Sequence, residues 1–131
     1  MSPNAANDLL STTVVLIVDD DANVRRVISR LLEACGCEVV AAETGSEGIA
    51  LFIEQPERFQ LLLIDQGLPD MKGDDLLVGI RQVDPEKKAL LMSGAYPSEG
   101  TDSVWDGFLL KPFGIDELRA TVTNVLESQA A

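Results

Sequence analysis

Five short apolar runs, with amphipathic stretches between most of them, constrain the fold of this chain more than any other feature. The runs lie at residues 13–18, 37–42, 60–65, 88–93 and 107–111. Continuous apolar runs are typical of strands that are buried on both faces of a parallel sheet. We therefore predict an α/β fold in which strands and helices alternate and helices cover both faces of the sheet.

The stretches between the runs contain signals that start and stop helices. Apolar residues recur at helical spacing from Val24 to Cys35, and Gly36 follows at the position typical of a helix end. The sequence TGSE at residues 44–47 is a capping box and predicts the start of a second helix. Further helices are predicted at residues 74–83 and 115–128.

Length and composition predict one soluble domain. The chain has 131 residues, 46% of them hydrophobic, and no apolar run approaches the roughly 18 residues of a membrane span. The net charge of −12, without any histidine, argues against a nucleic-acid surface, which needs clustered lysine and arginine. Cys35 and Cys37 lie too close for an ordinary disulfide, so we expect reduced thiols and a cytoplasmic protein. The short apolar runs lead us to expect no membrane insertion.

Polar residues end four of the five apolar runs. Asp19 and Asp20 follow the first, Asp65 ends the third, Ser93 ends the fourth and Lys111 ends the fifth. In an open parallel sheet, the carboxyl ends of the strands form the edge where ligands bind. We therefore expect these side chains to meet in one site.

The aspartates of this predicted site need a source of positive charge. Two carboxylates about 4 Å apart repel each other by roughly 4 kcal/mol at an effective dielectric constant near 20. Lys111 offsets part of this repulsion, and Mg²⁺ is the natural completion because it prefers oxygen ligands and the chain has no histidine to hold zinc. The alternative is that the acidic run at residues 19–21 caps the following helix, which accounts for Asp20 or Asp21 but not for Asp65.

Four motifs resemble the receiver domain of two-component response regulators. They are VLIVDDDANVRR, LLLIDQGLPDMKG, LLMSG and GFLLKPF, in this order and at this spacing. The resemblance spans Val14 to Glu127, and it is closest in style to receivers of hybrid histidine kinases and to single-domain regulators. It implies a flavodoxin-like (βα)5 doubly wound sheet of strand order 2-1-3-4-5. We divide the chain into a flexible lead-in (residues 1–12), a receiver (13–128) and a tail (129–131).

The resemblance implies how the acidic residues bind metal and phosphate. Asp65 stands at the phosphoacceptor position and would receive a phosphoryl group from a histidine kinase or a histidine phosphotransfer protein. Asp20 stands at the position of a direct Mg²⁺ ligand, and Asp19 at that of a ligand acting through water. The backbone carbonyl of Gly67 matches a further ligand. Asp21 is expected in an outer shell around the metal or as a helix cap.

The resemblance also implies roles at the ends of the fourth and fifth strands. Lys111 matches the lysine that contacts a phosphoryl oxygen, and Pro112 matches a proline preceded by a cis bond. Ser93 matches the hydroxyl that turns toward the phosphoryl group, and Phe108 the aromatic switch residue. Such a protein catalyses its own phosphorylation and its slow dephosphorylation, but it is a signalling receiver rather than an enzyme.

The interval between Ser93 and Phe108 departs from the family pattern. It is about four residues shorter than usual and contains Pro97 and Gly100, so we expect a shortened or irregular fourth helix. Dimerisation through that helix is therefore doubtful, and a phosphate relay fits better than DNA binding. Of the aromatic rings beside this interval, those of Tyr96 and Trp105, we expect one to be buried and the other exposed.

Three other functions compete with that of a phosphorylatable receiver. A degenerate receiver acting as a phosphorylation-independent protein-binding module is the main alternative, and it is disfavoured because all the family's site residues are present. A phosphohydrolase with an aspartyl nucleophile would need an acid/base aspartate two residues after Asp65, where Gly67 stands. A nucleotide-binding protein would need a glycine-rich loop after the first strand, and the sequence has none there.

Overall fold

Strands and helices alternate along the chain, as the apolar runs predict. The computed structural model describes residues 10–96 and 104–130. Its elements are β1 (Val14–Val18), α2 (Ala22–Ala34), β2 (Glu38–Ala42), α3 (Gly45–Glu54), the 3-10 turn η1 (Pro56–Arg58), β3 (Leu61–Asp65), α4 (Gly73–Val83), β4 (Ala89–Ser93), β5 (Gly107–Leu110) and α5 (Ile115–Ala130).

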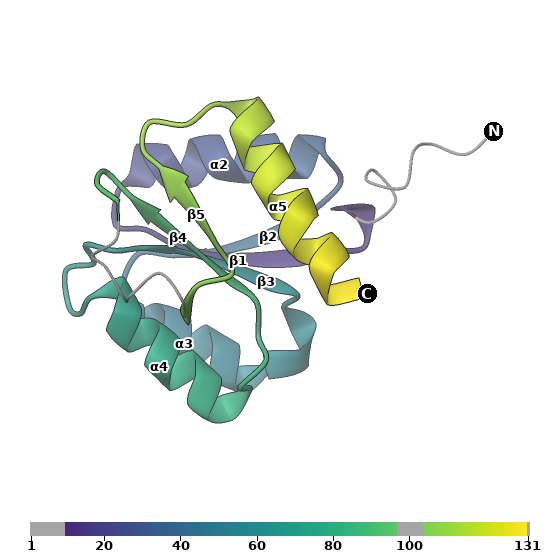
Figure 1. The fold of residues 1–131 in the computed structure, drawn as a ribbon. Coiled ribbons are helices and arrows are strands. Elements are labelled where there is room, and N and C mark those ends of the chain that lie inside the picture. Colours follow the sequence, from purple (N-terminus) through teal and green to yellow (C-terminus); the bar gives the residue numbers. More distant parts are fainter. Residues whose placement is uncertain (1–9, 97–103, 131) are drawn as a thin grey trace.

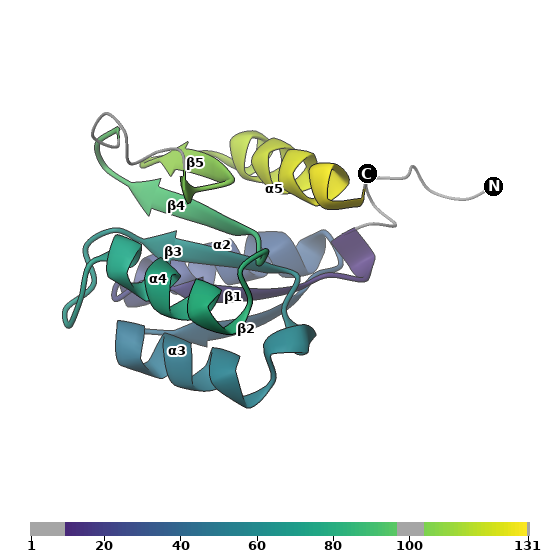
Figure 2. The ribbon, with the colours of Figure 1, turned by 60° about the horizontal axis from the view of Figure 1, so that its bottom comes forward.

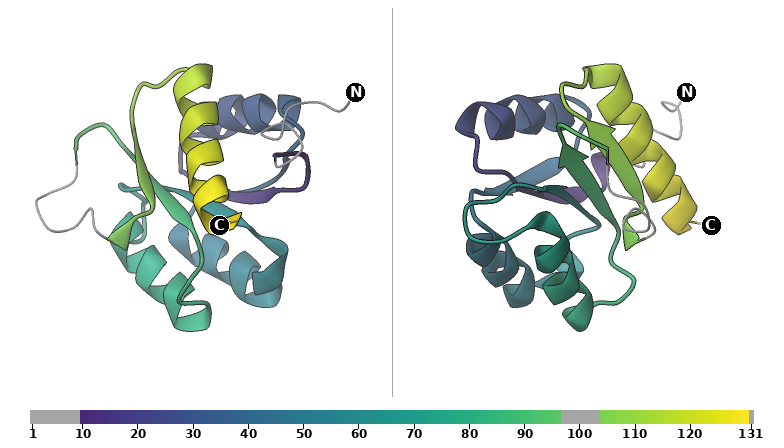
Figure 3. Two further views of the ribbon diagram at one scale, coloured as in Figure 1. Left: turned by 45° about the vertical axis from the view of Figure 1, so that its right-hand side comes forward. Right: turned by 60° about the vertical axis from the view of Figure 1, so that its left-hand side comes forward.

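The strands form a single five-stranded sheet with helices on both faces. All neighbouring strands are parallel, and their order is β2-β1-β3-β4-β5. Helices α2 and α5 cover one face, and α3 and α4 cover the other (Figures 1 and 2). Figure 3 shows the same division from two further sides. The predicted α/β fold with strand order 2-1-3-4-5 is confirmed.

Alternate residues of the strands point into two separate halves of the core. Under α2 and α5 the buried residues include Val15, Ile17, Leu63, Leu90, Ile28, Leu32, Leu118 and Val122. Under α3 and α4 they include Leu16, Val18, Ile64, Leu91, Phe52, Leu76, Leu77 and Ile80. Because both faces of the central strands are covered, polar side chains can approach these strands chiefly at their ends.

The helix signals in the sequence act as predicted. Asp21 caps α2, and its carboxylate accepts hydrogen bonds from backbone N–H groups of the first turn. Gly36 follows α2 with φ of 99°, in the left-handed region that favours glycine. Thr44 caps α3 by accepting from the N–H of Glu47, whose own carboxylate accepts from the N–H of Glu43. The capping box therefore reaches one residue further back than the usual pattern.

Some predicted boundaries fall at or outside the ends of the described chain. Residues 1–9 of the predicted lead-in lie outside the described residues, whereas Leu10 is 1% exposed and belongs to the core under α2 and α5. Helix α5 continues to Ala130, so part of the predicted tail is helical. The middle of the interval in which we predicted a shortened fourth helix, residues 97–103, also lies outside the described residues.

Two observations bear on the predictions about membrane insertion and about the cysteines. Within residues 10–96 and 104–130, no helix has the length and apolar character needed to cross a membrane. Cys35 and Cys37 are free, and Cys37 is buried. Burial, with a smaller contribution from Cys35, raises the pKa of the Cys37 thiol to about 11, so this thiol is protonated at neutral pH and a poor nucleophile.

Candidate functional site

The polar residues that end the strands meet at one edge of the sheet, which we call the carboxyl edge. Asp19 directly follows β1 and is completely buried, whereas the next residue, Asp20, is exposed. Asp65 is the last residue of β3 and is 8% exposed. Each of these three carboxylates offers an oxygen within 4.8 Å of the other two. The structure thus brings together the aspartates that the sequence placed at the strand ends.

Lys111 joins two of the three carboxylates. Its Nζ donates hydrogen bonds to Asp19 Oδ2 and to Asp65 Oδ1, both at 2.9 Å. The other oxygen of Asp19 accepts from the backbone N–H of Asp21 at 2.9 Å. The nearby guanidinium of Arg25 donates to the backbone carbonyl of Asp19 at 2.7 Å instead of to a carboxylate of the cluster. The cluster therefore keeps an excess of negative charge among the described residues.

Burial and charge change the pKa values of the two central groups. Burial, together with the charges of Asp19 and Asp20, raises the pKa of Asp65 and outweighs the lowering caused by Lys111. Burial alone would lower the pKa of Lys111, but its hydrogen bonds to Asp19 and Asp65 raise it above its usual value. Lys111 is therefore charged at neutral pH, while Asp65 lies in a place where additional positive charge is favourable.

The three carboxylates suit a hard divalent cation. Among the residues that the structure describes, Asp19, Asp20 and Asp65 form the one group that could hold a metal ion. They offer only oxygen ligands, which Mg²⁺ and Ca²⁺ prefer over the nitrogen and sulfur that zinc prefers. Gly67, predicted to add a backbone carbonyl, is exposed and forms an isolated β-bridge with Lys72. Ligation by its carbonyl stays a prediction.

Asp21 has a different local role from its two neighbours. Its Oδ1 accepts hydrogen bonds from the N–H groups of Asn23 at 2.9 Å and Val24 at 3.2 Å. These are N–H groups of the first turn of α2, which have no partner within the helix. The structure thus shows the capping interaction that we weighed for the acidic run, and an additional outer-shell role of Asp21 stays a prediction.

The predicted switch residues lie at the ends of β4 and β5. Ser93 is the last residue of β4, and its hydroxyl accepts a hydrogen bond from the N–H of Ala95 at 3.2 Å. Phe108 in β5 is half-buried, and its ring centroid lies 5.4 Å from that of the exposed Tyr96. The peptide bond before Pro112 is cis. The position of these residues is compatible with the roles that the sequence predicts for them, which stay predictions.

Of the two aromatic rings beside the shortened interval, one is buried and one is exposed, as predicted. Trp105 is 8% exposed, whereas Tyr96 is 74% exposed. Trp105 packs in the core under α3 and α4. Its indole N–H donates to the carboxylate of Asp74 at 3.0 Å, a contact that the sequence does not reveal.

Sequence reasoning also missed Asp70, which holds the loop after β3 against α3. Its carboxylate accepts from the N–H of Gly45 at 2.8 Å and from both the N–H and the hydroxyl of Ser46, at 2.9 and 2.7 Å. The hydrogen bonds from Ser46, followed by that from Gly45, lower the pKa of Asp70. An aspartate after proline is typical of a turn, but a partner 24 residues away leaves no local signal.

Comparison with known proteins identifies the family of the chain. The family model for the response regulator receiver domain matches residues 15–123. The chain therefore belongs to this family, and it is a signalling module rather than an enzyme in the usual sense. Its acidic pocket of Asp19, Asp20 and Asp65 agrees with a magnesium-dependent phosphoacceptor.

Curated relatives are longer than this chain. The sensor kinase CckA of Brucella abortus is 32% identical over 128 residues, which cover 95% of this chain and 14% of that protein. The KDP operon transcriptional regulatory protein KdpE of Escherichia coli is 34% identical over 122 residues, which cover 91% of this chain and 53% of that protein. The chain thus spans about half, or much less, of the length of these relatives.

Solved receiver structures match the fold over most of both chains. A CheY-like receiver domain protein from Methanospirillum hungatei has a TM-score of 0.81 and 33% identity, with 90% of this chain and 96% of that chain covered. The response regulator TrrA from Thermotoga maritima, in complex with Mg²⁺-BeF, has a TM-score of 0.79 and 27% identity, covering 86% and 98%. TrrA has also been solved in complex with the histidine kinase ThkA.

Proposed function

We propose that this receiver accepts a phosphoryl group on Asp65 from a phosphohistidine of a histidine kinase or a histidine phosphotransfer protein. A bond forms between an Asp65 oxygen and phosphorus while the phosphorus–nitrogen bond of the donor breaks. The released imidazole keeps the electron pair of that bond and takes a proton from solvent. The product is an aspartyl phosphate, which either switches the protein or passes the phosphoryl group on.

The contact of Lys111 with both Asp19 and Asp65 is the observation on which this proposal rests. Lys111 Nζ binds Asp65 Oδ1, so we assign the other oxygen, Oδ2, as the nucleophile. A carboxylate is a weak nucleophile, and phosphoryl transfer therefore depends mainly on placement and on neutralising charge. An ammonium group held 2.9 Å from the acceptor carboxylate lies where it can bind an oxygen of the incoming phosphoryl group.

We assign the metal as Mg²⁺, held by Asp19, Asp20 and Asp65 with the carbonyl of Gly67. The all-oxygen ligand set supports this assignment, as does the Mg²⁺-BeF complex of the relative TrrA. Bound Mg²⁺ supplies positive charge that stabilises phosphoryl oxygens in the transition state. The chain's own contribution is to keep three carboxylates in place at the ends of β1 and β3, with Lys111 completing the site.

For the response to phosphorylation, we assign Ser93 and Phe108 as the switching pair. Within the described residues, the Ser93 hydroxyl accepts a hydrogen bond from the N–H of Ala95 at 3.2 Å, so turning toward a phosphoryl group costs one weak hydrogen bond. Phe108 is half-buried, and its ring packs against the exposed ring of Tyr96, so an inward turn would exchange this surface contact for burial.

An apolar cleft beside Lys111 supports docking of the donor protein at this edge. The cleft lies between α2 and the turn after β5, and its lining includes Val24, Val27, Ile28 and Phe113 together with Lys111. Val27, in the lining of this cleft, is 53% exposed and so adds apolar surface that a partner could cover. A partner seated there would contact the same lysine that binds Asp65.

We also propose that the protein works in the cytoplasm. The two free cysteines fit a reducing compartment. The net charge of −12 opposes direct binding to the phosphate backbone of nucleic acids. A basic or cationic partner surface is the expected complement of this charge.

Intact mass after incubation with Mg²⁺ and acetyl phosphate tests the proposed function. We expect the chain to gain one phosphate, because the small phosphodonor needs only the acceptor site and the metal. Asp65→Asn should gain none. The matched control is Asp116→Asn, which removes an exposed carboxylate from the first turn of α5 and should gain phosphate normally. Equal gain in Asp65→Asn, or no gain in the unsubstituted chain, would contradict the proposal.

A further inference from the structure

A single carboxylate, that of Asp74, connects the end of β3 to the segment before β5. Gln66 follows the proposed acceptor residue, and its side-chain Nε2 donates to Asp74 Oδ2 at 3.0 Å. The other carboxylate oxygen, Oδ1, accepts from Trp105 Nε1 at 3.0 Å. These partners lie 8 and 31 residues from Asp74, which is in the first turn of α4. Hydrogen bonds to a charged acceptor are stronger than neutral ones.

Close packing fixes the Gln66 end of this connection. The backbone of Gln66 pairs on both sides, since its N–H donates to Met92 O at 3.0 Å and its carbonyl accepts from Gly73 at 2.9 Å. A Cβ added at Gly73 would lie 2.8 Å from the carbonyl oxygen of Asp65 and 3.0 Å from Gln66 Oε1. Glycine at position 73 therefore allows α4 to approach the acceptor residue this closely.

In the side-chain amide of Gln66, the nitrogen has a hydrogen-bond partner among the described residues but the oxygen has none. Its Oε1 is buried without a hydrogen-bond partner among the described residues. An unpaired buried oxygen destabilises the folded state. Another hydrogen bond of the same side chain therefore has to hold it in this position. The carboxylate of Asp74 is that partner, because it accepts from the Nε2 of the same amide.

The Trp105 end is fixed by burial and by the backbone next to it. The indole packs in the core with Leu76 and Leu77 of α4. A buried indole N–H needs an acceptor, and Asp74 provides it. The carbonyl of the preceding residue, Val104, accepts a hydrogen bond from Arg81 of the same helix. A displacement of Asp74 would therefore change the hydrogen bond and the surroundings of the indole ring.

We propose that Asp74 is a positioning residue for the acceptor site, which holds Gln66 beside Asp65 and transmits occupation of the site to Trp105. The proposal rests on the proposed function of Asp65 as phosphoacceptor. Gln66 is covalently attached to Asp65, so an incoming phosphoryl group that shifts the end of β3 shifts the Gln66 amide and, through Asp74, the indole. Asp74 touches neither the phosphoryl group nor the metal in this account.

The experiment follows phosphorylation by Mg²⁺ and acetyl phosphate with two readouts on the same sample. Intact mass reports phosphate on the protein, and the emission of Trp105, the only tryptophan of the chain, reports its surroundings. In the unsubstituted chain we expect the emission to change with the same time course as phosphate gain. Phosphate gain with constant emission would overturn this inference and leave the proposed function standing, whereas no phosphate gain overturns both.

Variants separate positioning from a general effect of charge or stability. Asp74→Ala should slow phosphate gain by about tenfold, since small misplacements of a reacting group are costly, and it should abolish the emission change. Asp74→Asn should restore both, because its Oδ1 accepts from Trp105 Nε1 and its Nδ2 can donate to Gln66 Oε1 once the Gln66 amide has rotated by about 180°. Asp75→Ala, which removes an exposed carboxylate from the same helical turn, should behave like the unsubstituted chain.

Two further results would overturn the inference. One is an Asp74→Ala protein that is phosphorylated at the normal rate with the full emission change. The other is equal slowing in Asp74→Ala and Asp75→Ala, which would assign the effect to helix charge. Should Asp74→Ala not fold, Gln66→Leu breaks the connection while keeping the contact of Asp74 with Trp105. We then expect phosphate gain without the emission change, and an unaltered emission change would contradict the coupling.

Discussion

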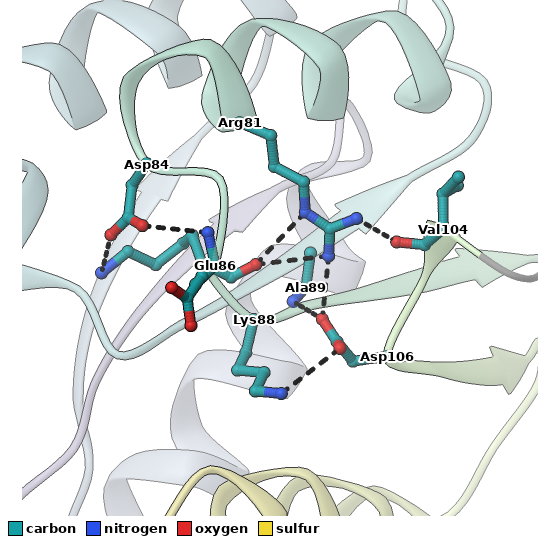
Figure 4. A network of polar contacts seen from close by, with 8 residues as sticks. Arg81, Asp84, Glu86, Lys88, Ala89, Val104 and Asp106 are labelled. Atoms are coloured by element: carbon teal, nitrogen blue, oxygen red, sulfur yellow. Dashed lines mark hydrogen bonds and ion pairs between the residues drawn. The ribbon is translucent and has the colours of Figure 1, made fainter.

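The two edges of the sheet differ in how completely their charged side chains are paired. At the amino edge, where the strands begin, Asp106 accepts from Arg81 at 3.0 Å and from the N–H of Ala89 at 2.9 Å, and Lys88 lies 3.6 Å away (Figure 4). At the carboxyl edge, one lysine, Lys111, serves a cluster of three carboxylates in the described part of the chain. At the amino edge, positive and negative side chains pair with one another, which stabilises the fold. The carboxyl edge keeps unpaired negative charge that can bind a cation.

Other polar groups at the amino edge are paired in the same way. The Nζ of the buried Lys87 donates to the carbonyl of Phe59 at 2.5 Å and lies 3.5 Å from Asp84. The Oε1 of Gln60, just before β3, accepts from the N–H of Val14, the first residue of β1, at 2.7 Å. The carbonyl of Phe59 and the carboxylate of Asp84 thus offset part of the cost of removing the Lys87 charge from water.

The largest change in the free energy of unfolding should come from removing the charge pairing at the amino edge. Asp106→Ala leaves Arg81, Lys88 and the N–H of Ala89 without their shared acceptor, and should lower the free energy of unfolding by about 2 kcal/mol. Urea denaturation measures this loss. Glu33→Ala, which removes an exposed carboxylate from α2, should change the free energy by less than about 0.5 kcal/mol. Similar losses in the two variants would show that the amino edge adds no stability.

At the carboxyl edge, the missing positive charge should be supplied by a metal. Mg²⁺ at about ten times its dissociation constant should stabilise the domain by about 1.4 kcal/mol, or roughly 5 °C in Tm. Thermal unfolding with Mg²⁺ and with EDTA measures the difference. Asp20→Asn should lose most of it, whereas Asp21→Asn, which keeps the helix cap, should retain most of it. An equal rise in all three proteins would point to an effect unrelated to the site.

The smallest of these effects has the opposite sign to the first. Without Mg²⁺ at pH 7, Asp65→Asn should raise the free energy of unfolding by about 1 kcal/mol, because it removes one carboxylate from the repulsion while its oxygen still accepts from Lys111. Urea denaturation in EDTA measures this gain. A loss of stability would show that the acidic cluster is already balanced by Lys111.

The stabilisation by Asp65→Asn should depend on pH. Because the pKa of Asp65 is raised on folding, its contribution to stability is complete below the unfolded pKa of about 3.9 and is lost as pH rises through the folded pKa. The advantage of the variant should therefore be full at pH 7 and shrink toward pH 4. An advantage that is constant over this range would assign it to something other than the charge of Asp65.

Local patterns in the sequence predicted most of the fold. The third apolar run at residues 60–65 became β3 (Leu61–Asp65), and the helical spacing at 74–83 became α4 (Gly73–Val83). Both depend on periodicity, which the chain displays within one element. The carboxyl-edge site was predictable too, because parallel strands bring their last residues together wherever the sheet forms.

Contacts between distant residues could not be predicted in this way. Asp70 reaches Ser46, Asp74 reaches Trp105 and Asp106 reaches Arg81, and each pair is at least 24 residues apart. Which polar side chains meet depends on how α3, α4 and β5 pack, and one-dimensional spacing does not contain that information. The burial of Leu10, a residue of the predicted lead-in, could not be predicted for the same reason, since it depends on residues far along the chain.

Chemical location of the phosphoryl group tests the central claim most directly. The chain is incubated with Mg²⁺ and acetyl phosphate and treated with borohydride, which reduces an aspartyl phosphate to homoserine, and the peptides are sequenced by tandem mass spectrometry. We predict homoserine at position 65 alone, with Asp19 and Asp20 unchanged. Homoserine at one of those two positions, or none anywhere in a chain that gained phosphate, would contradict the assignment of Asp65 as phosphoacceptor.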